Sequence, residues 1–193
     1  MTKSLLALDV ATVTGFAFGE IGQVPKADSI RFGSKNATDD ECWGAATRWL
    51  VDFLKVFTPD VVALEAPIMS SSAAGGTNPH TQMRLLGLQA VLRNVVALRL
   101  PRPAKLVHVQ SARKLFIGHG NLRGEEAKKR VKQRCIELGW LTPEGATYDK
   151  ADALCVFAKA AADLDKDFAA NFTPLMTSPA NIYRLRPDVE LEF

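Results

Sequence analysis

Four acidic residues stand where the sequence predicts that strands end or a helix begins. Asp9 closes one apolar run and Glu65 closes a second. Asp149 and Asp152 lie three residues apart at the start of an alanine-rich apolar segment. A carboxylate at the end of a buried run is costly unless a partner compensates it, and hard divalent cations suit several converging oxygens. These residue types and positions predict a metal site.

Such a site is suited to the hydrolysis of phosphodiester bonds. Two metal ions about 3.5–4 Å apart can activate a water, hold the phosphate in line and stabilise the leaving oxygen. Asp9 is predicted to bridge both ions, because it ends a central strand. Glu65 and Asp149 would each favour one ion, and Asp152 would complete the set. Taken singly, each carboxylate also fits a strand-end turn or a helix N-terminus, where negative charge is favourable.

The bulk composition indicates a globular protein. Of 193 residues, 47% are hydrophobic and 23% are charged, with a formal net charge of +3. This length suits one domain, which we expect over residues 1–165, with a C-terminal tail of unknown role over 166–193. Three scattered cysteines without metal-ligand spacing indicate a reducing compartment. The sequence has neither a secretory signal pattern nor a bilayer-spanning run, so we expect a cytoplasmic protein with no membrane partner.

The hydrophobic pattern predicts five strands, over residues 4–9, 14–20, 28–33, 61–65 and 104–109. The link at 10–13 is short enough for an antiparallel hairpin. The later strands require helical crossovers, so we expect them to be parallel.

Helical spacing predicts four helices, over residues 38–57, 80–99, 124–138 and 149–164. Thr38 is a predicted N-cap, with acidic residues in the first turn after it. The whole order is that of a mixed α/β fold. If the first and fourth strands are neighbours, Asp9 and Glu65 meet. Asp149 and Asp152 share one helical face and must then pack beside them.

Several short motifs, in this order and spacing, resemble those of RuvC-type Holliday junction resolvases of the RNase H-like superfamily. The short phage-type members are the more similar ones. The resemblance covers about residues 4–160. Its motifs are Leu8-Asp9, Thr14-Gly15-Phe16-Ala17, Ala63-Leu64-Glu65, the helix with Leu85-Leu86-Gly87 and Gln89, Val109-Gln110-Ser111-Ala112-Arg113-Lys114, Gly118-His119-Gly120 and Asp149-Lys150-Ala151-Asp152-Ala153-Leu154.

The resemblance implies an RNase H-like mixed five-stranded sheet, with three antiparallel strands and then two parallel ones, flanked by helices. It implies a Mg²⁺-dependent endonuclease that cuts four-way or other branched DNA as a homodimer. We expect it to use two ions, with Mn²⁺ able to substitute for Mg²⁺. Its metal ligands and catalytic residues would be Asp9, Glu65, Asp149 and Asp152. The expected location is the cytoplasm of a bacterium or a phage-infected host cell, and no nucleotide cofactor is expected.

The chain departs from the family pattern at two places. Val10-Ala11 follows the first aspartate, where the family usually has Pro-Gly. Bacterial members place an aromatic wedge shortly after the glutamate, whereas this chain has Ala66-Pro67-Ile68-Met69, so any wedge would be aliphatic.

Basic and polar residues around the predicted site are candidates for contacts with DNA. A phosphate track would use the basic residues between 113 and 134, although a solvated helix face gives the same pattern: Arg113, Lys114, Arg123, Lys128, Lys129, Arg130, Lys132 and Arg134. Lys150 either touches the scissile phosphate or points outward. Ser70 and Ser71 belong to a loop that either connects or closes over DNA, and His119 either contacts a phosphate or is uninvolved.

Other functions remain open from the sequence. The same chemistry serves nucleases that act on forks, flaps or RNA–DNA hybrids. Nucleotide-binding proteins of the actin and sugar-kinase type share the strand arrangement but need two such domains. A non-catalytic DNA-binding descendant is the third class. The apolar residues of the 80–99 helix exceed one narrow stripe, so this helix packs either on the sheet alone or also on a second subunit.

Overall fold

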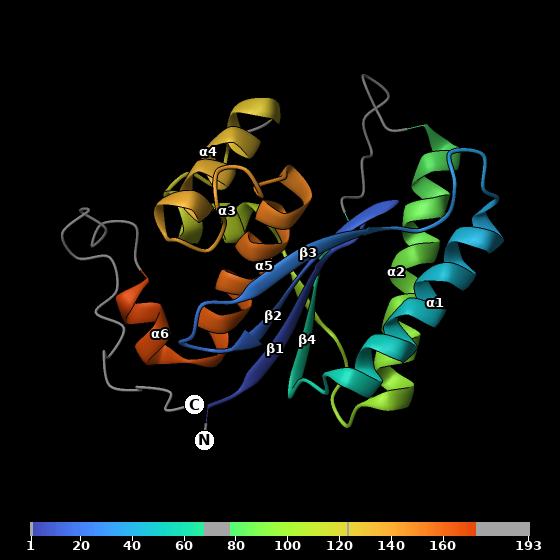
Figure 1. Cartoon of the computed structure of the whole chain (residues 1–193), viewed down its shortest axis with the longest axis horizontal. Coiled ribbons are helices and arrows are strands. Elements are labelled where there is room, and N and C mark those ends of the chain that lie inside the picture. The colour runs from blue at the N-terminus through green and yellow to red at the C-terminus, as the bar shows by residue number, and fades with distance from the viewer. Residues whose placement is uncertain (1, 68–77, 123, 173–193) are drawn as a thin grey trace.

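A five-stranded sheet forms the centre of the protein in the computed structural model, which describes residues 2–67, 78–122 and 124–172 (Figure 1). The strand order is β3-β2-β1-β4-β5. The strands are β1 (Ser4–Asp9), β2 (Val13–Glu20), β3 (Lys26–Arg31), β4 (Val61–Glu65) and β5 (Lys105–Val107).

The pairing of the strands divides the sheet into two parts. β1 pairs antiparallel with β2, and β2 pairs antiparallel with β3. On its other side β1 pairs parallel with β4, and β4 pairs parallel with β5. The predicted fold class, a mixed sheet with three antiparallel strands followed by two parallel ones, is therefore confirmed.

Helices cover both faces of the sheet (Figure 1). One layer holds α1 and α2, and the other holds the remaining helices. Their bounds are α1 (Asp39–Val56), α2 (Pro79–Arg99), α3 (Val109–Ile117), α4 (Gly124–Glu137), α5 (Tyr148–Leu164) and α6 (Lys166–Asn171). Each layer has its own buried core, because alternate residues of β1 point to opposite faces. Leu5 and Ala7 join the core beneath α5, whereas Leu6 and Leu8 join the core beneath α1 and α2.

The start of α1 follows the predicted capping pattern. The Thr38 hydroxyl accepts a hydrogen bond from the Glu41 amide at 3.3 Å. The Glu41 carboxylate accepts one in return from the Thr38 amide at 2.7 Å. This reciprocal arrangement satisfies two amides that the first helical turn leaves without partners.

The structure differs from the expectations in three regions of the chain. The third strand begins and ends two residues earlier than 28–33, because Phe32 turns into the core and Gly33 has a positive φ of 86°. β5 is only three residues long, and α3, which the pattern did not predict, begins at Val109 directly after it.

The third difference lies past residue 165, where the sequence showed no clear period. The Asp165 carboxylate accepts hydrogen bonds from the amides of Asp167 and Phe168, both at 2.9 Å, and so caps α6. Phe168 and Phe172 are buried in the core beneath α5. This part of the predicted tail therefore belongs to the packed structure, and residues 173–193 lie outside the described part of the chain.

No helix within the described ranges is long and apolar enough to cross a membrane.

Candidate active site

The sheet places Asp9 and Glu65 side by side, as the sequence predicted. β1 and β4 are parallel neighbours, with Leu8 in register with Leu64. Asp9 and Glu65 are the next residues and end their strands at the same edge of the sheet. The carboxyl ends of parallel strands, where a sheet meets its loops, are a common place for a binding site.

α5 brings Asp152 to this edge, because the helix packs against β1 and β2. The approach is close at one point: a Cβ added to Gly15 would lie 1.8 Å from the Asp149 carbonyl oxygen. Only glycine leaves room for the helix backbone here. Thr147 caps the helix by accepting a hydrogen bond from the Lys150 amide at 3.3 Å. Asp149 therefore lies in the first turn and Asp152 one turn further on, as predicted.

The three carboxylates interact strongly in the absence of a cation. Burial raises the pKa of Asp9 well above its ordinary value, and the charges of Glu65 and Asp152 raise it further. Burial and the charge of Asp152 raise the pKa of Glu65 from 4.5 to about 6. Burial also raises the pKa of Asp152, with a smaller contribution from Asp149. Asp9 and Glu65 are close enough to share a hydrogen bond, with the protonated Asp9 carboxyl as the donor.

This arrangement has the donor chemistry of a divalent-cation site. Partly buried carboxylates that repel each other destabilise the folded protein, and a cation between them reverses that effect. Oxygen donors from two strand ends and one helix are the ligands that Mg²⁺ prefers. Within residues 2–67, 78–122 and 124–172, no three His, Cys, Asp or Glu side chains converge closely enough to form a ready-made metal site. The carboxylates fit the cation in type and charge.

Two cationic side chains act on the carboxylates from the helices above them. Arg113 on α3 and Lys128 on α4 both lower the pKa values of Glu65 and Asp152. An Arg113 Nη1 donates to the Leu122 carbonyl at 3.4 Å. The Arg113 Nε is buried and has no hydrogen-bond partner in the described part of the chain. Both cations therefore belong to the carboxylate site.

The other predicted DNA contacts occupy different environments. Lys150 forms an ion pair with Asp28 of β3 at 3.1 Å, and this pair ties the start of α5 to the edge of the sheet. Lys132 lies over the Tyr148 ring, 5.2 Å from its centroid. Lys129 pairs with Glu125 on its own helix at 3.0 Å.

Lys114 and His119 are exposed. The remaining predicted DNA contacts, Ser70, Ser71 and Arg123, lie outside the described residues.

Two polar residues that the sequence did not single out as site residues support the strand ends. The buried Thr14 hydroxyl donates to the Ala11 carbonyl at 2.6 Å and accepts from the Ala11 amide at 3.2 Å, so it fixes the turn that follows Asp9. Gln89 on α2 donates from Nε2 to the Glu65 carbonyl at 2.6 Å. Sequence reasoning could have identified Gln89, because it is a polar residue among the leucines and valines of an otherwise apolar stretch.

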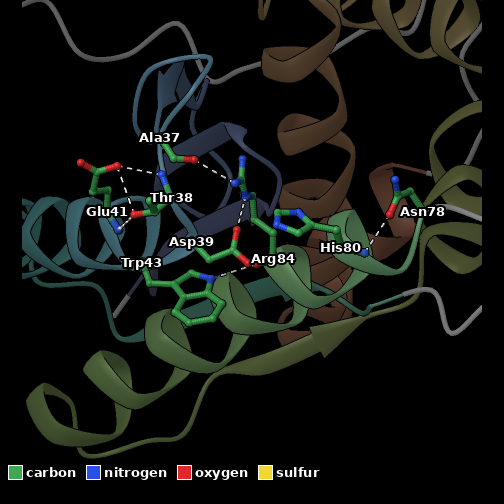
Figure 2. A network of polar contacts seen from close by, with 8 residues as sticks. All are labelled: Ala37, Thr38, Asp39, Glu41, Trp43, Asn78, His80 and Arg84. Atoms are coloured by element: carbon green, nitrogen blue, oxygen red, sulfur yellow. Dashed lines mark hydrogen bonds and ion pairs between the residues drawn. The ribbon is translucent and has the colours of Figure 1, made fainter.

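A polar cluster fastens the first half of α2 to α1 (Figure 2). The Trp43 Nε1 donates to the Arg84 carbonyl at 3.1 Å. The Arg84 guanidinium donates to Asp39 at 2.5 Å and to the Ala37 carbonyl at 2.9 Å. A Cβ on Gly87 would lie 2.1 Å from the Trp43 ring. Gln89 lies on the same helix five residues after Arg84, so this cluster holds the helix that contacts Glu65.

Comparison with solved structures identifies the fold. No protein-family model matches the chain, and no curated protein matches it in sequence. The structure of Thermus thermophilus RuvC matches with a TM-score of 0.56 at 17% identity, covering 79% of this chain and 90% of that one. This protein has the fold of a RuvC-type resolvase.

Two further structures agree with this RuvC-type fold. T. thermophilus RuvC in complex with a Holliday junction substrate matches with a TM-score of 0.61 at 13% identity, covering 80% of this chain and 89% of that one. The yeast mitochondrial Holliday junction resolvase Ydc2 matches with a TM-score of 0.54 at 15% identity, covering 87% of this chain and 83% of that one. The predicted resemblance to RuvC-type resolvases is thereby confirmed at the level of the fold.

Proposed function

We propose that this protein is a metal-dependent endonuclease that hydrolyses phosphodiester bonds in branched DNA, with the four-way junction as its main substrate. The observation that carries the proposal is the group of three mutually repelling carboxylates, Asp9, Glu65 and Asp152, at one edge of a RuvC-type sheet. Such a site destabilises the folded protein when no cation is bound, and a bound cation compensates the repulsion between the carboxylates. The match to T. thermophilus RuvC in complex with a Holliday junction substrate supports the choice of substrate.

The four predicted ligands have distinct positions in the proposed site. Asp9 and Glu65 come from adjacent rigid strands, and Asp149 and Asp152 come from the first turns of α5. Two Mg²⁺ ions, or Mn²⁺ in their place, would supply activation of a water and stabilisation of the leaving oxygen. The protein's part is to hold these oxygens on elements that do not move, with Thr14 and Gln89 fixing the two strand ends.

Arg113 and Lys128 are the proposed phosphate contacts nearest the chemistry, because both already interact with the carboxylates. Such contacts position the DNA backbone without reading its sequence. Lys114 and His119 are exposed and available for outer contacts, and Ser70, Ser71 and Arg123 are proposed contacts outside the described residues. Three other lysines already have partners in the protein, and they can contact DNA only if they release or share these partners: Lys129, Lys132 and Lys150.

A homodimer is part of the proposal. α2 exposes apolar side chains on its outer surface: Met83 is 63% exposed, Leu86 is 37% exposed and Leu98 is 75% exposed. Large exposed apolar side chains gathered on one helix are typical of an interface. A symmetric dimer through this helix would present two carboxylate sites to one four-way junction.

A nuclease that acts on forks or flaps is the second candidate. The stretch Ala66-Pro67-Ile68-Met69, which follows Glu65, has no aromatic side chain that could be inserted into a junction. A broader preference for branched DNA is consistent with that sequence.

Cleavage assays test the proposal directly. A labelled four-way junction is incubated beside a linear duplex, a fork, a flap and an RNA–DNA hybrid, with Mg²⁺, Mn²⁺ or chelator. We expect metal-dependent, paired cuts in the junction that Asp9→Asn abolishes and that Asp52→Asn, on the far face of the molecule, leaves intact. Asp52 is a suitable control because its side chain is 70% exposed and lies on α1.

The alternatives give different results in the same assay. Cutting of forks or flaps at similar rates would make the protein a broader branched-DNA nuclease. Salt-sensitive junction binding without cutting in any metal would overturn the nuclease proposal in favour of a non-catalytic DNA-binding protein.

A further inference from the structure

An open pocket of about 490 Å³ lies between α3 and α4. Its apolar floor is formed by Phe116 and Ile117 of α3, and its polar side is formed by five residues of α4: Lys129, Arg130, Gln133, Arg134 and Glu137. The three cations outnumber the single carboxylate. We call it the α3–α4 pocket. Its volume is in the usual range for ligand sites, about 300–1,000 Å³. An apolar floor beside three cations suits a partner that is both apolar and acidic.

The α3–α4 pocket is separate from the carboxylate site. An α-helix turns by about 100° per residue, so Arg130 and Gln133 lie on roughly the opposite side of α4 from Lys128. Lys128 is the α4 residue that acts on the carboxylates. The basic residues of α4 therefore serve two surfaces, and the pocket does not belong to the proposed nuclease chemistry.

Two of the three cations of the pocket, Lys129 and Arg130, are held only loosely by their present partners. Arg130 pairs with Glu126 at 2.8 Å and Lys129 pairs with Glu125 at 3.0 Å, both between neighbouring turns on the exposed surface of α4. Arg134 lies 3.6 Å from Glu137, and its side chain is only 12% exposed. The exposed pairs of Lys129 and Arg130 contribute little and exchange readily with an incoming carboxylate.

The described chain ends beside this pocket. The Phe172 ring stacks on the Phe116 ring, with centroids 5.7 Å apart, and Phe172 is itself buried. Phe172, the last described residue, therefore lies next to the pocket floor. The 15 residues from 173 to 187 can span up to about 50 Å, which is longer than the diameter of a domain of this size, so the segment that follows them can return to the pocket.

The last six residues have the chemistry that the pocket requires. Residues 188–193 read Asp-Val-Glu-Leu-Glu-Phe, a strict alternation of acidic and apolar side chains without a basic residue. In an extended conformation, alternate side chains point to opposite sides, so one side would be acidic and the other apolar. Its apolar side matches Phe116 and Ile117, and its carboxylates match the cations of α4.

We propose that residues 188–193 of this chain bind in the α3–α4 pocket of the same molecule. Tethering raises the local concentration of the segment to about the millimolar range, so a weak peptide interaction is sufficient for docking. Duplex DNA fits the pocket less well, because a phosphate backbone uses the cations but leaves the apolar floor uncovered. The proposal does not rest on the proposed nuclease function.

Disulfide trapping in the full-length protein tests the docking. The double variant Gln133→Cys, Leu191→Cys places one thiol at the pocket and one on the segment. Position 133 tolerates a new thiol because Gln133 is exposed. The matched control is Val56→Cys with Leu191→Cys, because Val56 is 91% exposed at the end of α1 on the other face of the sheet. The three native cysteines are buried and interfere little.

We expect the intramolecular disulfide to form at least tenfold faster at position 133 than at position 56 in a glutathione buffer. Arg130→Glu should slow trapping at 133 at least threefold, and adding Glu190→Lys and Glu192→Lys should restore it. A synthetic Asp-Val-Glu-Leu-Glu-Phe peptide should compete, and a peptide of the same composition in scrambled order should not.

Two results would overturn the proposal. Equal trapping rates at 133 and 56 would show that the segment has no preference for the pocket. Disulfide-linked dimers as the main product at 133 would show that the pocket takes the segment of a second copy.

Discussion

Replacement of Glu65 by glutamine should stabilise the folded protein at pH 8 in the presence of a chelator. Burial and the charge of Asp152 raise the pKa of Glu65 from 4.5 in the unfolded chain to about 6 in the folded one. The folded state therefore prefers the protonated form. The stability associated with that proton is complete below pH 4.5 and is lost as the pH rises through about 6.

The size of the effect follows from the pKa difference. A shift of about 1.5 units corresponds to about 2 kcal/mol, at about 1.4 kcal/mol per unit. Glutamine has the shape of glutamate without its charge, and its amide can donate to Asp9. Glu65→Gln is therefore expected to raise the free energy of unfolding by about 2 kcal/mol at pH 8 and by less than about 0.5 kcal/mol at pH 4.5.

Urea unfolding, followed by the fluorescence of the three tryptophans, measures this difference in chelator at both pH values. Glu144→Gln is the matched control, because Glu144 is exposed and should leave the free energy of unfolding unchanged at either pH. Mg²⁺ should reverse the order at pH 8, since binding at the proposed site would stabilise the wild type through the carboxylates. If Glu65→Gln is no more stable than wild type at pH 8 in chelator, the reasoning that the carboxylates repel each other is refuted.

Three further changes test the packing and the site. Gly15→Ala should destabilise the protein by at least about 3 kcal/mol in urea unfolding, because its Cβ would lie 1.8 Å from the Asp149 carbonyl oxygen. Gly44→Ala is its control and should stabilise the protein by about 0.5–1 kcal/mol, since its Cβ meets only the flexible Arg48 side chain. Loss of stability in both variants, or in neither variant, would contradict the packing argument. Phe172→Ala should cost about 3–5 kcal/mol, because the ring is buried; a cost below about 1 kcal/mol would mean that the chain past 165 does not belong to the core. Saturating Mg²⁺ should raise the thermal midpoint of the wild type but not that of Asp9→Asn, and equal shifts would place the cation elsewhere.

The sequence predicted those structural features that depend on residues close to one another along the chain. The apolar runs that end at Asp9 and Glu65 are strands because hydrophobic residues follow one another without interruption and turn residues come after them. Thr38 caps α1 because Glu41 follows it at the N3 position, which is the spacing that a capping box requires. The order of these elements was enough to predict the sheet, to place Asp9 and Glu65 at one edge of it, and to expect Asp152 of α5 beside them.

Elements with little local pattern were missed. α3 was not predicted, because it begins directly after β5, an edge strand of three residues within the predicted 104–109 strand, and no period of 3.6 extends far enough there to be recognised. α6 has six residues, and its stability comes from Phe168 and Phe172 packing against distant aromatic rings rather than from its own sequence.

The tertiary structure alone decided how the polar side chains are used. The sequence presents the basic residues of α4 as one track, but packing of α4 against α3 and α5 turns Lys128 toward the carboxylates and Arg130 toward a separate pocket. Likewise, only the approach of α5 to β2 explains Gly15, and only the contact of α2 with β4 assigns Gln89 to the Glu65 carbonyl. Local patterns fix which residues form each element, whereas the partners of a side chain depend on contacts between segments that lie far apart along the chain.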